Sequence, residues 1–321
     1  MGFTRDELME TYEKLSFCRQ YELKYEQGAL SGEIKGFTHS ALGEEAIFAA
    51  FLTERGPNDW LFPNDIRDLS LVAAVFGPRE GTAELTGRMP GPNKGVAGGG
   101  HLYSKEQRFG PCYGLIGQQN GVAAGIALAM KLNKVDGCVI CATGDGTMNE
   151  GMVAESMNLV ATMKLPFFLV VQNNKYGLSM SCDKHSATPL PKRVEGFGIP
   201  CQVVDGVDML AVKQAFRDSI AKARKGEPVA VEGRVHRWSG HFVGDPQKYR
   251  DKQELANVRS ADPLKFLRDH LINNNLAAAD ELDAIDKKGK ELSDDAFEFA
   301  LSSPQHTKEF ICVENARNLY A

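Results

Sequence analysis

Two short polar motifs follow two apolar runs of the sequence, and their residue types suit binding of a phosphate and a hard cation. Gly144-Asp145-Gly146 comes directly after the first apolar run, and Asn173-Asn174 comes directly after the second. Asp145 can hold a divalent cation through its carboxylate, and Asn174 can add a neutral oxygen ligand. Magnesium prefers a few such oxygens together with phosphate oxygens, so the two motifs predict a magnesium–diphosphate site.

The two motifs are expected to meet at one edge of a sheet. Runs rich in Val, Ile and Phe alternate with helical patterns between residues 137 and 235, which is typical of a parallel sheet covered by helices on both faces. Ligands collect at the carboxyl ends of the strands in such a sheet. A helix expected to begin near Thr147 would offer free N–H groups and its dipole to a diphosphate, and Gly146 would let the backbone come close.

Gly-Asp-Gly alone is a common turn, so its pairing with Asn-Asn after the next strand supports the assignment. The competing G-x-G-x-x-G, P-loop and H-E-x-x-H motifs are absent from the sequence. The glycine-rich segment 86–117 is long for a connection inside a compact domain, which favours a functional loop. It leads directly into a helical pattern at 118–131.

The remaining elements complete one α/β domain, expected to span residues 1–321 with a helical tail from about residue 263. A capping box at Thr4 and Glu7 starts the first helix, and Gly28 and Gly32 are expected to end it. Strands are expected at residues 137–143, 166–172, 200–204 and 228–235. Further helices are expected from about residue 43 to 55, at 147–163 and 207–224, and twice within 263–299.

The composition is that of a soluble globular protein. The chain has 321 residues, a formal net charge of -5, 43% apolar residues and no basic cluster, so no nucleic-acid partner is expected. No stretch approaches the roughly 18 apolar residues of a membrane span, and the polar start lacks the apolar core of a secretory signal. Seven cysteines argue against a disulfide framework, and Cys138 and Cys141 are interpreted as buried strand residues. A cytoplasmic or organelle-matrix enzyme without a membrane partner is expected.

Several motifs in a fixed order resemble the alpha subunits of the thiamin diphosphate-dependent dehydrogenases. These subunits belong to the first, decarboxylating component of the pyruvate, branched-chain 2-oxo acid and acetoin dehydrogenase complexes. The length of the chain and its residues at 240–245 are most similar to those of the acetoin type. The resemblance implies a thiamin diphosphate-binding α/β fold. It rests on residues 36–39, 43–46, 83–88, 99–101, 114–117, 144–151, 165–166, 173–177, 240–246 and 249–250.

The resemblance implies a role for each residue at the metal and the diphosphate. Asp145 and Asn174 would ligate magnesium through their side chains, and Tyr176 through its carbonyl oxygen. Gly146 and Thr147 would meet the diphosphate. These roles agree with the chemistry expected from the two motifs alone.

The resemblance also implies contacts around the organic part of the cofactor. Gly114 and Ile116 would contact the aminopyrimidine, and Ile116 would help to force the bent shape of the cofactor. His241 would face the reactive thiazolium carbon and bind a substrate oxygen or donate a proton. His39 would line the substrate side. Three other histidines lack such context and are expected to be solvated: His185, His270 and His306.

One segment departs from the family pattern, which usually has a Tyr-Arg or His-Arg pair followed by a histidine. In an ungapped alignment Asp65 takes the aromatic position, Ile66 the arginine position and Asp68 the histidine position. Arg67 could replace the lost cation at the diphosphate if the backbone shifts by one residue. An acid beside a diphosphate is repulsive, so Asp65 is expected to point elsewhere. The departure predicts weaker cofactor binding or a different substrate.

The resemblance implies a partner chain, because it places the glutamate that activates the cofactor on a separate beta subunit, and no glutamate here matches that motif. The predicted function is therefore the alpha subunit of a heterotetramer that cleaves a 2-oxo acid or an acyloin and transfers the acyl or aldehyde unit. The acceptor would be a lipoyl-bearing acyltransferase. Two alternatives stay open: a carboligase or acyl-transferring enzyme of a specialised pathway, also with a beta subunit, and a non-catalytic assembly subunit.

Overall fold

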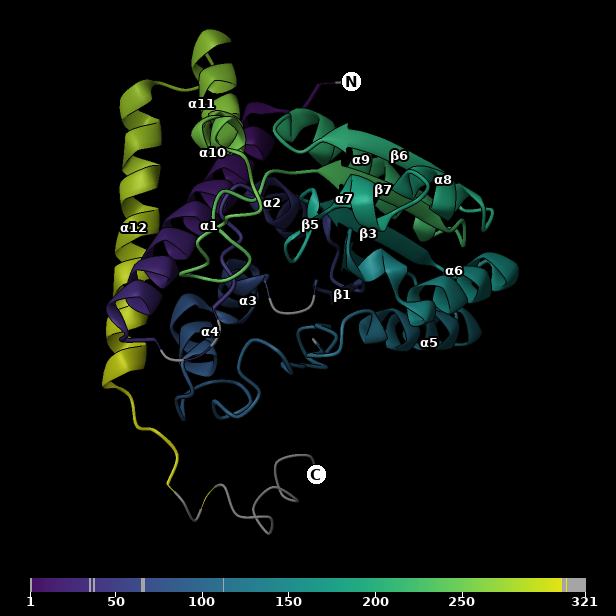
Figure 1. The fold of residues 1–321 in the computed structure, drawn as a ribbon, viewed down its shortest axis with the longest axis horizontal. Helices are drawn as coiled ribbons and strands as arrows, with labels where there is room; N and C mark the ends of the chain where they lie inside the picture. The colour runs from purple at the N-terminus through teal and green to yellow at the C-terminus, as the bar shows by residue number, and fades with distance from the viewer. Residues whose placement is uncertain are drawn as a thin grey trace.

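A five-stranded parallel sheet forms the centre of the protein in a computed structural model that describes residues 2–307, except 35, 37, 65, 66 and 112, together with residue 310 (Figure 1). The strand order is β1-β2-β3-β7-β6, and every neighbouring pair is parallel. The predicted α/β class with a mostly parallel sheet is confirmed. The strands are β1 (Trp60–Phe62), β2 (Val139–Gly144), β3 (Phe167–Asn173), β6 (Cys201–Asp205) and β7 (Val229–Arg234), and a separate hairpin joins β4 (Tyr176–Gly177) to β5 (Met180–Ser181).

Successive residues of the sheet point into two separate cores, as the period of a strand requires. On β2, Ile140 packs into one core, and Val139 and Cys141 pack into the other. Cys138 and Cys141 are buried and neither forms a disulfide, as expected; Cys141 lies on β2, whereas Cys138 lies one residue before the strand. The first core is covered by α2 (Glu45–Glu54) and α9 (Met209–Ala223), and the second by α5 (Gln118–Leu132) and α6 (Gly151–Met163).

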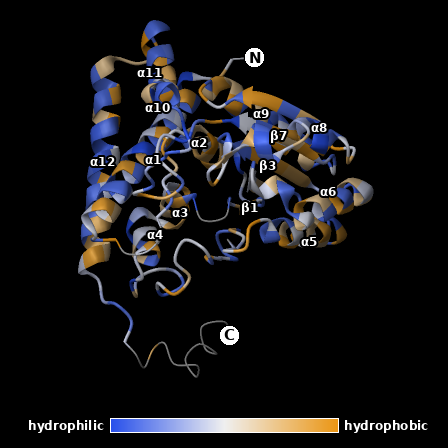
Figure 2. Ribbon diagram, in the orientation of Figure 1, coloured by the Kyte–Doolittle hydropathy of each residue, from blue (hydrophilic) through white to orange (hydrophobic). Residues whose placement is uncertain are grey.

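A second layer of helices lies outside α2. The first helix, α1 (Arg5–Ser31), begins at the predicted capping box of Thr4 and Glu7, passes through Gly28 and ends at Gly32, whose φ is 80°. The predicted end at Gly28 is therefore wrong. The C-terminal α12 (Ala279–Ser302) lies along α1 (Figure 1), and Figure 2 shows hydrophilic residues mixed with hydrophobic ones along both helices. This layer also contains α3 (Leu69–Phe76), α4 (Pro78–Leu85) and α11 (Pro263–Asn273).

The helix expected from Thr147 begins later than predicted. A single 3-10 turn (Thr147–Asn149) follows β2, and α6 begins at Gly151 because Glu150 between them has extended backbone, with φ -74° and ψ 139°. The sequence pattern also does not indicate the short elements β1, α3, α4, α7 (Cys182–His185), α8 (Leu190–Glu195) and α10 (Lys252–Asn257). In the described part of 86–117 there is no helix or named strand, as expected. None of the described helices is long and apolar enough to cross a membrane.

Candidate functional site

A cavity of about 450 Å³ opens at the carboxyl ends of β2 and β3. Gly144 pairs with Gln172 in the sheet register, so the Gly144-Asp145-Gly146 motif lies beside Asn173-Asn174. Among the described residues predicted for the site, Gly114 alone does not line the cavity, and a Cβ at its position would lie 3.7 Å from the His101 ring. The predicted residues that line it are His39, Arg67, Ile116, Asp145, Gly146, Thr147, Asn174, Tyr176 and His241.

The loop of Asp145 and the hairpin β4–β5 are in close contact at Gly146 and Gly177. A Cβ built on Gly146 would lie 3.0 Å from the Cα of Gly177, which is closer than most real Cβ contacts. The absence of a side chain at Gly146 therefore lets the hairpin β4–β5 close against the Asp145 loop. The Gly146 φ of -65° is ordinary, so close approach rather than backbone conformation requires this glycine.

Asp145 carries the buried carboxyl group of the cavity. Asp145 is only 2% exposed, and its Oδ2 lies 3.2 Å from Nε2 of His185. Burial raises the pKa of the Asp145 carboxyl, and the nearby His185 opposes that effect. A buried carboxylate with so little counter-charge fits a hard cation, which would stabilise its ionised form.

His185 does not have the solvated surroundings that its sequence context predicted. Helix α7 brings its ring into the lining of the cavity and against Asp145. No periodic pattern in the sequence predicts this contact. It arises because the hairpin β4–β5 packs against the loop that follows β2, through Gly177 and Gly146. His185 is thus a site residue that the sequence interpretation missed.

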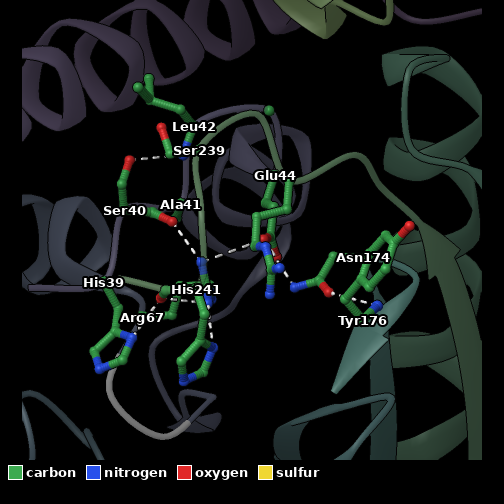
Figure 3. Close-up of polar contacts among 12 residues, drawn as sticks. His39, Ser40, Ala41, Leu42, Glu44, Arg67, Asn174, Tyr176, Ser239 and His241 are labelled. Carbon is green, nitrogen blue, oxygen red and sulfur yellow. Dashed lines mark hydrogen bonds and ion pairs between the residues drawn. The ribbon is translucent and has the colours of Figure 1, made fainter. Parts of the chain in front are cut away.

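The Asn174 amide is held between two partners (Figure 3). Its Nδ2 donates to Glu44 Oε1 at 3.0 Å, and its Oδ1 accepts from the backbone N–H of Tyr176 at 3.2 Å. Burial raises the pKa of the fully buried Glu44 carboxyl, and the Arg67 guanidinium, 3.9 Å away, opposes that effect. Glu44 lies in one of the segments that carried the family resemblance, but no role was predicted for it.

Two histidine rings lie edge to face in the cavity, with centroids 4.7 Å apart. His39 Nδ1 donates to the backbone carbonyl of His241 at 2.6 Å, which leaves its Nε2 as an acceptor. Arg67 Nη2 lies 3.4 Å from His241 Nδ1, and because a guanidinium only donates, the ring hydrogen of His241 is on Nε2. The two rings project in the same direction (Figure 3).

Burial and neighbouring cations keep both rings uncharged near neutral pH. Burial, together with Arg67, lowers the pKa of His241 to about 4. Burial also lowers the pKa of His39, although its hydrogen bond to the His241 carbonyl opposes that effect. The cavity therefore offers one N–H donor and one nitrogen lone pair close together.

Arg67 lines the cavity. Its guanidinium could there replace the cation that residues 65–68 lack relative to the family pattern. Its Nη1 donates to the Ser40 carbonyl at 2.6 Å, and its Nη2 donates to the His241 carbonyl at 3.2 Å. Asp68 accepts from the Asn64 backbone N–H at 2.7 Å and is not among the cavity-lining residues. Asp65 and Ile66 lie outside the described residues, so the predicted orientation of Asp65 stays a prediction.

Fold and site define an α/β protein with a carboxyl group and an amide oxygen at the ends of two adjacent parallel strands, beside two uncharged histidines. The family model described as "Dehydrogenase E1 component" matches residues 13–309. This chain belongs to that family. The predicted class, an alpha subunit of a thiamin diphosphate-dependent 2-oxo acid dehydrogenase first component, is confirmed.

Three relatives illustrate the match. "Pyruvate dehydrogenase E1 component subunit alpha" of Rhizobium meliloti (strain 1021) is 34% identical over 306 residues, which cover 94% of this chain and 88% of the relative. The somatic mitochondrial form from Homo sapiens is 36% identical, covering 94% and 77%. The chloroplastic alpha-3 form from Arabidopsis thaliana is 33% identical, covering 94% and 72%. The acetoin type expected from the sequence stays a prediction.

Proposed function

We propose that this chain assembles with a beta subunit into a heterotetramer that decarboxylates a small 2-oxo acid, with pyruvate as the first candidate, using thiamin diphosphate and Mg²⁺. The observation that carries the proposal is the meeting of Asp145, Asn174, His39 and His241 in one cavity. The relatives named as pyruvate dehydrogenase subunits support the choice of substrate. When bound, thiamin diphosphate supplies the nucleophilic carbon and stores the electron pair released by decarboxylation.

The ends of β2 and β3 would hold the metal and the diphosphate. The Asp145 and Asn174 side chains and the Tyr176 carbonyl would supply oxygen ligands to Mg²⁺, which favours a few protein oxygens together with phosphate oxygens. Gly146 and Thr147 would bring backbone N–H groups to the diphosphate, and the Arg67 guanidinium adds positive charge at the same cavity.

The two histidines would bind the substrate oxygen and donate or accept a proton there. His241 Nε2–H can donate to a carbonyl oxygen and stabilise negative charge that develops there. The lone pair on His39 Nε2 can accept a hydrogen bond or a proton on the same side of the cavity. Because both rings are uncharged near neutral pH, neither repels the cationic Arg67 beside them.

The mouth of the cavity has the character of a surface that a partner covers. Ile116, Leu178 and Met180 line the cavity and yet remain exposed, at 44%, 58% and 52%. Exposed apolar groups gathered at one opening often mark a protein interface. Among the described residues that line the cavity there is no glutamate, and the activating glutamate is proposed to come from the beta subunit.

Titration of thiamin diphosphate with Mg²⁺ into the chain, alone and with its beta subunit, tests the proposal. We expect binding and pyruvate decarboxylation, followed with an artificial electron acceptor, only when both chains are present. Robust turnover by this chain alone would contradict the need for a beta subunit. Absence of cofactor binding under both conditions would favour a non-catalytic assembly subunit. Cleavage of acetoin without 2-oxo acid turnover would assign the acetoin type instead.

A carboligase or acyl-transferring activity is the second candidate. It is favoured by residues 65–68, which depart from the family pattern. Where relatives of the resembled type have a histidine, this chain has Asp68, which accepts from the Asn64 backbone and does not line the cavity. The substrate side would then lack one imidazole. Product analysis with an added aldehyde acceptor, compared with an added lipoyl domain, separates carboligation from acyl transfer to a lipoyl-bearing acyltransferase.

A further inference from the structure

A continuous set of polar contacts leads from Arg193 on α8 to Asp145 at the end of β2. Arg193 Nη1 donates to Asn149 Oδ1 at 2.8 Å. Nδ2 of Asn149 lies 3.0 Å from Nδ1 of His185, and Nε2 of His185 lies 3.2 Å from Oδ2 of Asp145. His185, which follows the Asn-Asn motif in the sequence, thus contacts the carboxylate of the Gly-Asp-Gly motif.

The chemistry of these groups fixes the position of the His185 ring hydrogen. A guanidinium only donates, so the Asn149 atom that faces Arg193 is the oxygen, and the amide nitrogen lies on the other side. That nitrogen also donates to the Gly146 carbonyl at 3.2 Å, which fixes the amide orientation independently. Because an amide nitrogen only donates, His185 Nδ1 must accept, and the ring hydrogen is on Nε2, facing Asp145.

The same hydrogen position separates two interpretations of the cluster formed by Asp145, Cys182 and His185. Their ligand atoms lie within 4.8 Å of one another, a set that would suit a thiophilic metal such as Zn²⁺. His185 would then have to offer a ring lone pair to the metal. Its Nδ1 lone pair is used by Asn149 and its Nε2 carries the hydrogen, so the contacts favour a hydrogen-bond donor over a metal ligand.

We propose that His185 is a positioning residue for the metal site. Its Nε2–H holds Oδ2 of Asp145, and Asn149 and Arg193 keep the ring in the tautomer that donates. This restrains the rotation of the buried Asp145 carboxylate before the cation binds. The inference rests on the proposed function, since it assigns Asp145 to Mg²⁺. Loss of such a partner behind a metal ligand typically weakens metal affinity by about 10- to 100-fold.

The test compares Mg²⁺ affinity in the presence of thiamin diphosphate, measured by calorimetry on the full chain assembled with its beta subunit. We expect His185→Ala to weaken Mg²⁺ binding by about 10- to 100-fold. His185→Gln should retain most of the affinity, because a glutamine amide can donate to Asp145 and accept from Asn149. His270→Ala, on the separate helix α11, is the matched control and should bind as the wild type does. Unchanged melting temperatures would show that each variant is folded.

Any of four results would overturn the proposal. The first is His185→Ala with wild-type Mg²⁺ affinity, and the second is a loss in His185→Gln as large as that in His185→Ala. The third is a ¹⁵N NMR spectrum of the chain that places the His185 ring hydrogen on Nδ1. The fourth is a Co²⁺ charge-transfer band that disappears in Cys182→Ser. Failure of the proposed function is distinguishable, because the wild type itself would then not bind Mg²⁺ with thiamin diphosphate.

Discussion

Asn174 Nδ2 donates to Glu44 Oε1 at 3.0 Å, although the two residues are 130 positions apart in the sequence. Because a carboxylate accepts and the amide nitrogen donates, Glu44 determines which end of the Asn174 amide turns away from it. The Asn174 oxygen consequently faces the Tyr176 backbone N–H, beside the cavity. The segment that precedes α2 thus sets the orientation of an expected metal ligand at the end of β3.

Substitution Glu44→Ala should weaken Mg²⁺-dependent binding of thiamin diphosphate by about 10-fold or more, since it releases the Asn174 amide. Glu44→Gln should lose less, because its amide oxygen can still accept from Asn174. Calorimetric titration measures both effects, with Glu298→Gln on the exposed side of α12 as the matched control. Equal affinity in Glu44→Ala and wild type would show that Glu44 does not orient Asn174.

Substitution Asp145→Ala should abolish Mg²⁺-dependent cofactor binding while the fold is retained. The carboxylate is expected to be the anionic metal ligand of the cavity, and its burial raises the pKa of its carboxyl, so its removal costs the apo chain little. Calorimetry measures the binding, and circular dichroism checks the fold. Wild-type binding in this variant would refute the assignment of the metal site.

Substitution His241→Ala should lower kcat by about 100-fold or more in the assembled enzyme, because it removes the proposed hydrogen-bond donor to the substrate oxygen. Binding of thiamin diphosphate should change much less, since the metal and diphosphate contacts remain. Steady-state kinetics with pyruvate and calorimetry on the same preparation measure the two effects. A parallel loss of cofactor binding and turnover would instead assign His241 to cofactor binding.

The stability of the apo chain should depend on the protonation of His241. Its pKa is about 4 in the folded chain and 6.5 in an unperturbed side chain, so the unfolded chain takes up the proton first as the pH falls. The associated stability is fully present above pH 6.5 and is lost between 6.5 and about 4. The loss should be roughly 1 to 2 kcal/mol, allowing for screening at this half-buried ring. A flatter dependence of Tm on pH in His241→Gln would confirm it, and an unchanged slope would contradict it.

Substitution Gly146→Ala should weaken cofactor binding, because the new Cβ would lie 3.0 Å from the backbone of Gly177 and push the two motif loops apart. Gly125→Ala is the control, since its Cβ would meet nothing within 4 Å. Gly125 lies inside α5, where alanine should raise the stability of the isolated chain by about 1 kcal/mol. Thermal melting and calorimetry measure both variants. Unchanged cofactor affinity in Gly146→Ala would show that the loops tolerate the separation.

The sequence by itself determined the parallel sheet and the place of the site on it. Apolar strand patterns are local, and both Gly144-Asp145-Gly146 and Asn173-Asn174 begin on the last residue of a strand. The carboxyl ends of neighbouring parallel strands share one edge, so their proximity follows from strand order alone. The capping box at Thr4 was equally predictable, because it involves residues only three positions apart.

Only the tertiary structure decided which groups surround these motifs. It showed that α6 begins at Gly151 rather than near Thr147, and it brought His185 against Asp145, Glu44 against Asn174 and Arg67 against His241. These contacts join residues 40, 130 and 174 positions apart, through loops and short helices without a periodic pattern. The hydrogen positions on the histidine rings depend on such long-range partners, because a ring nitrogen donates or accepts according to the group that faces it.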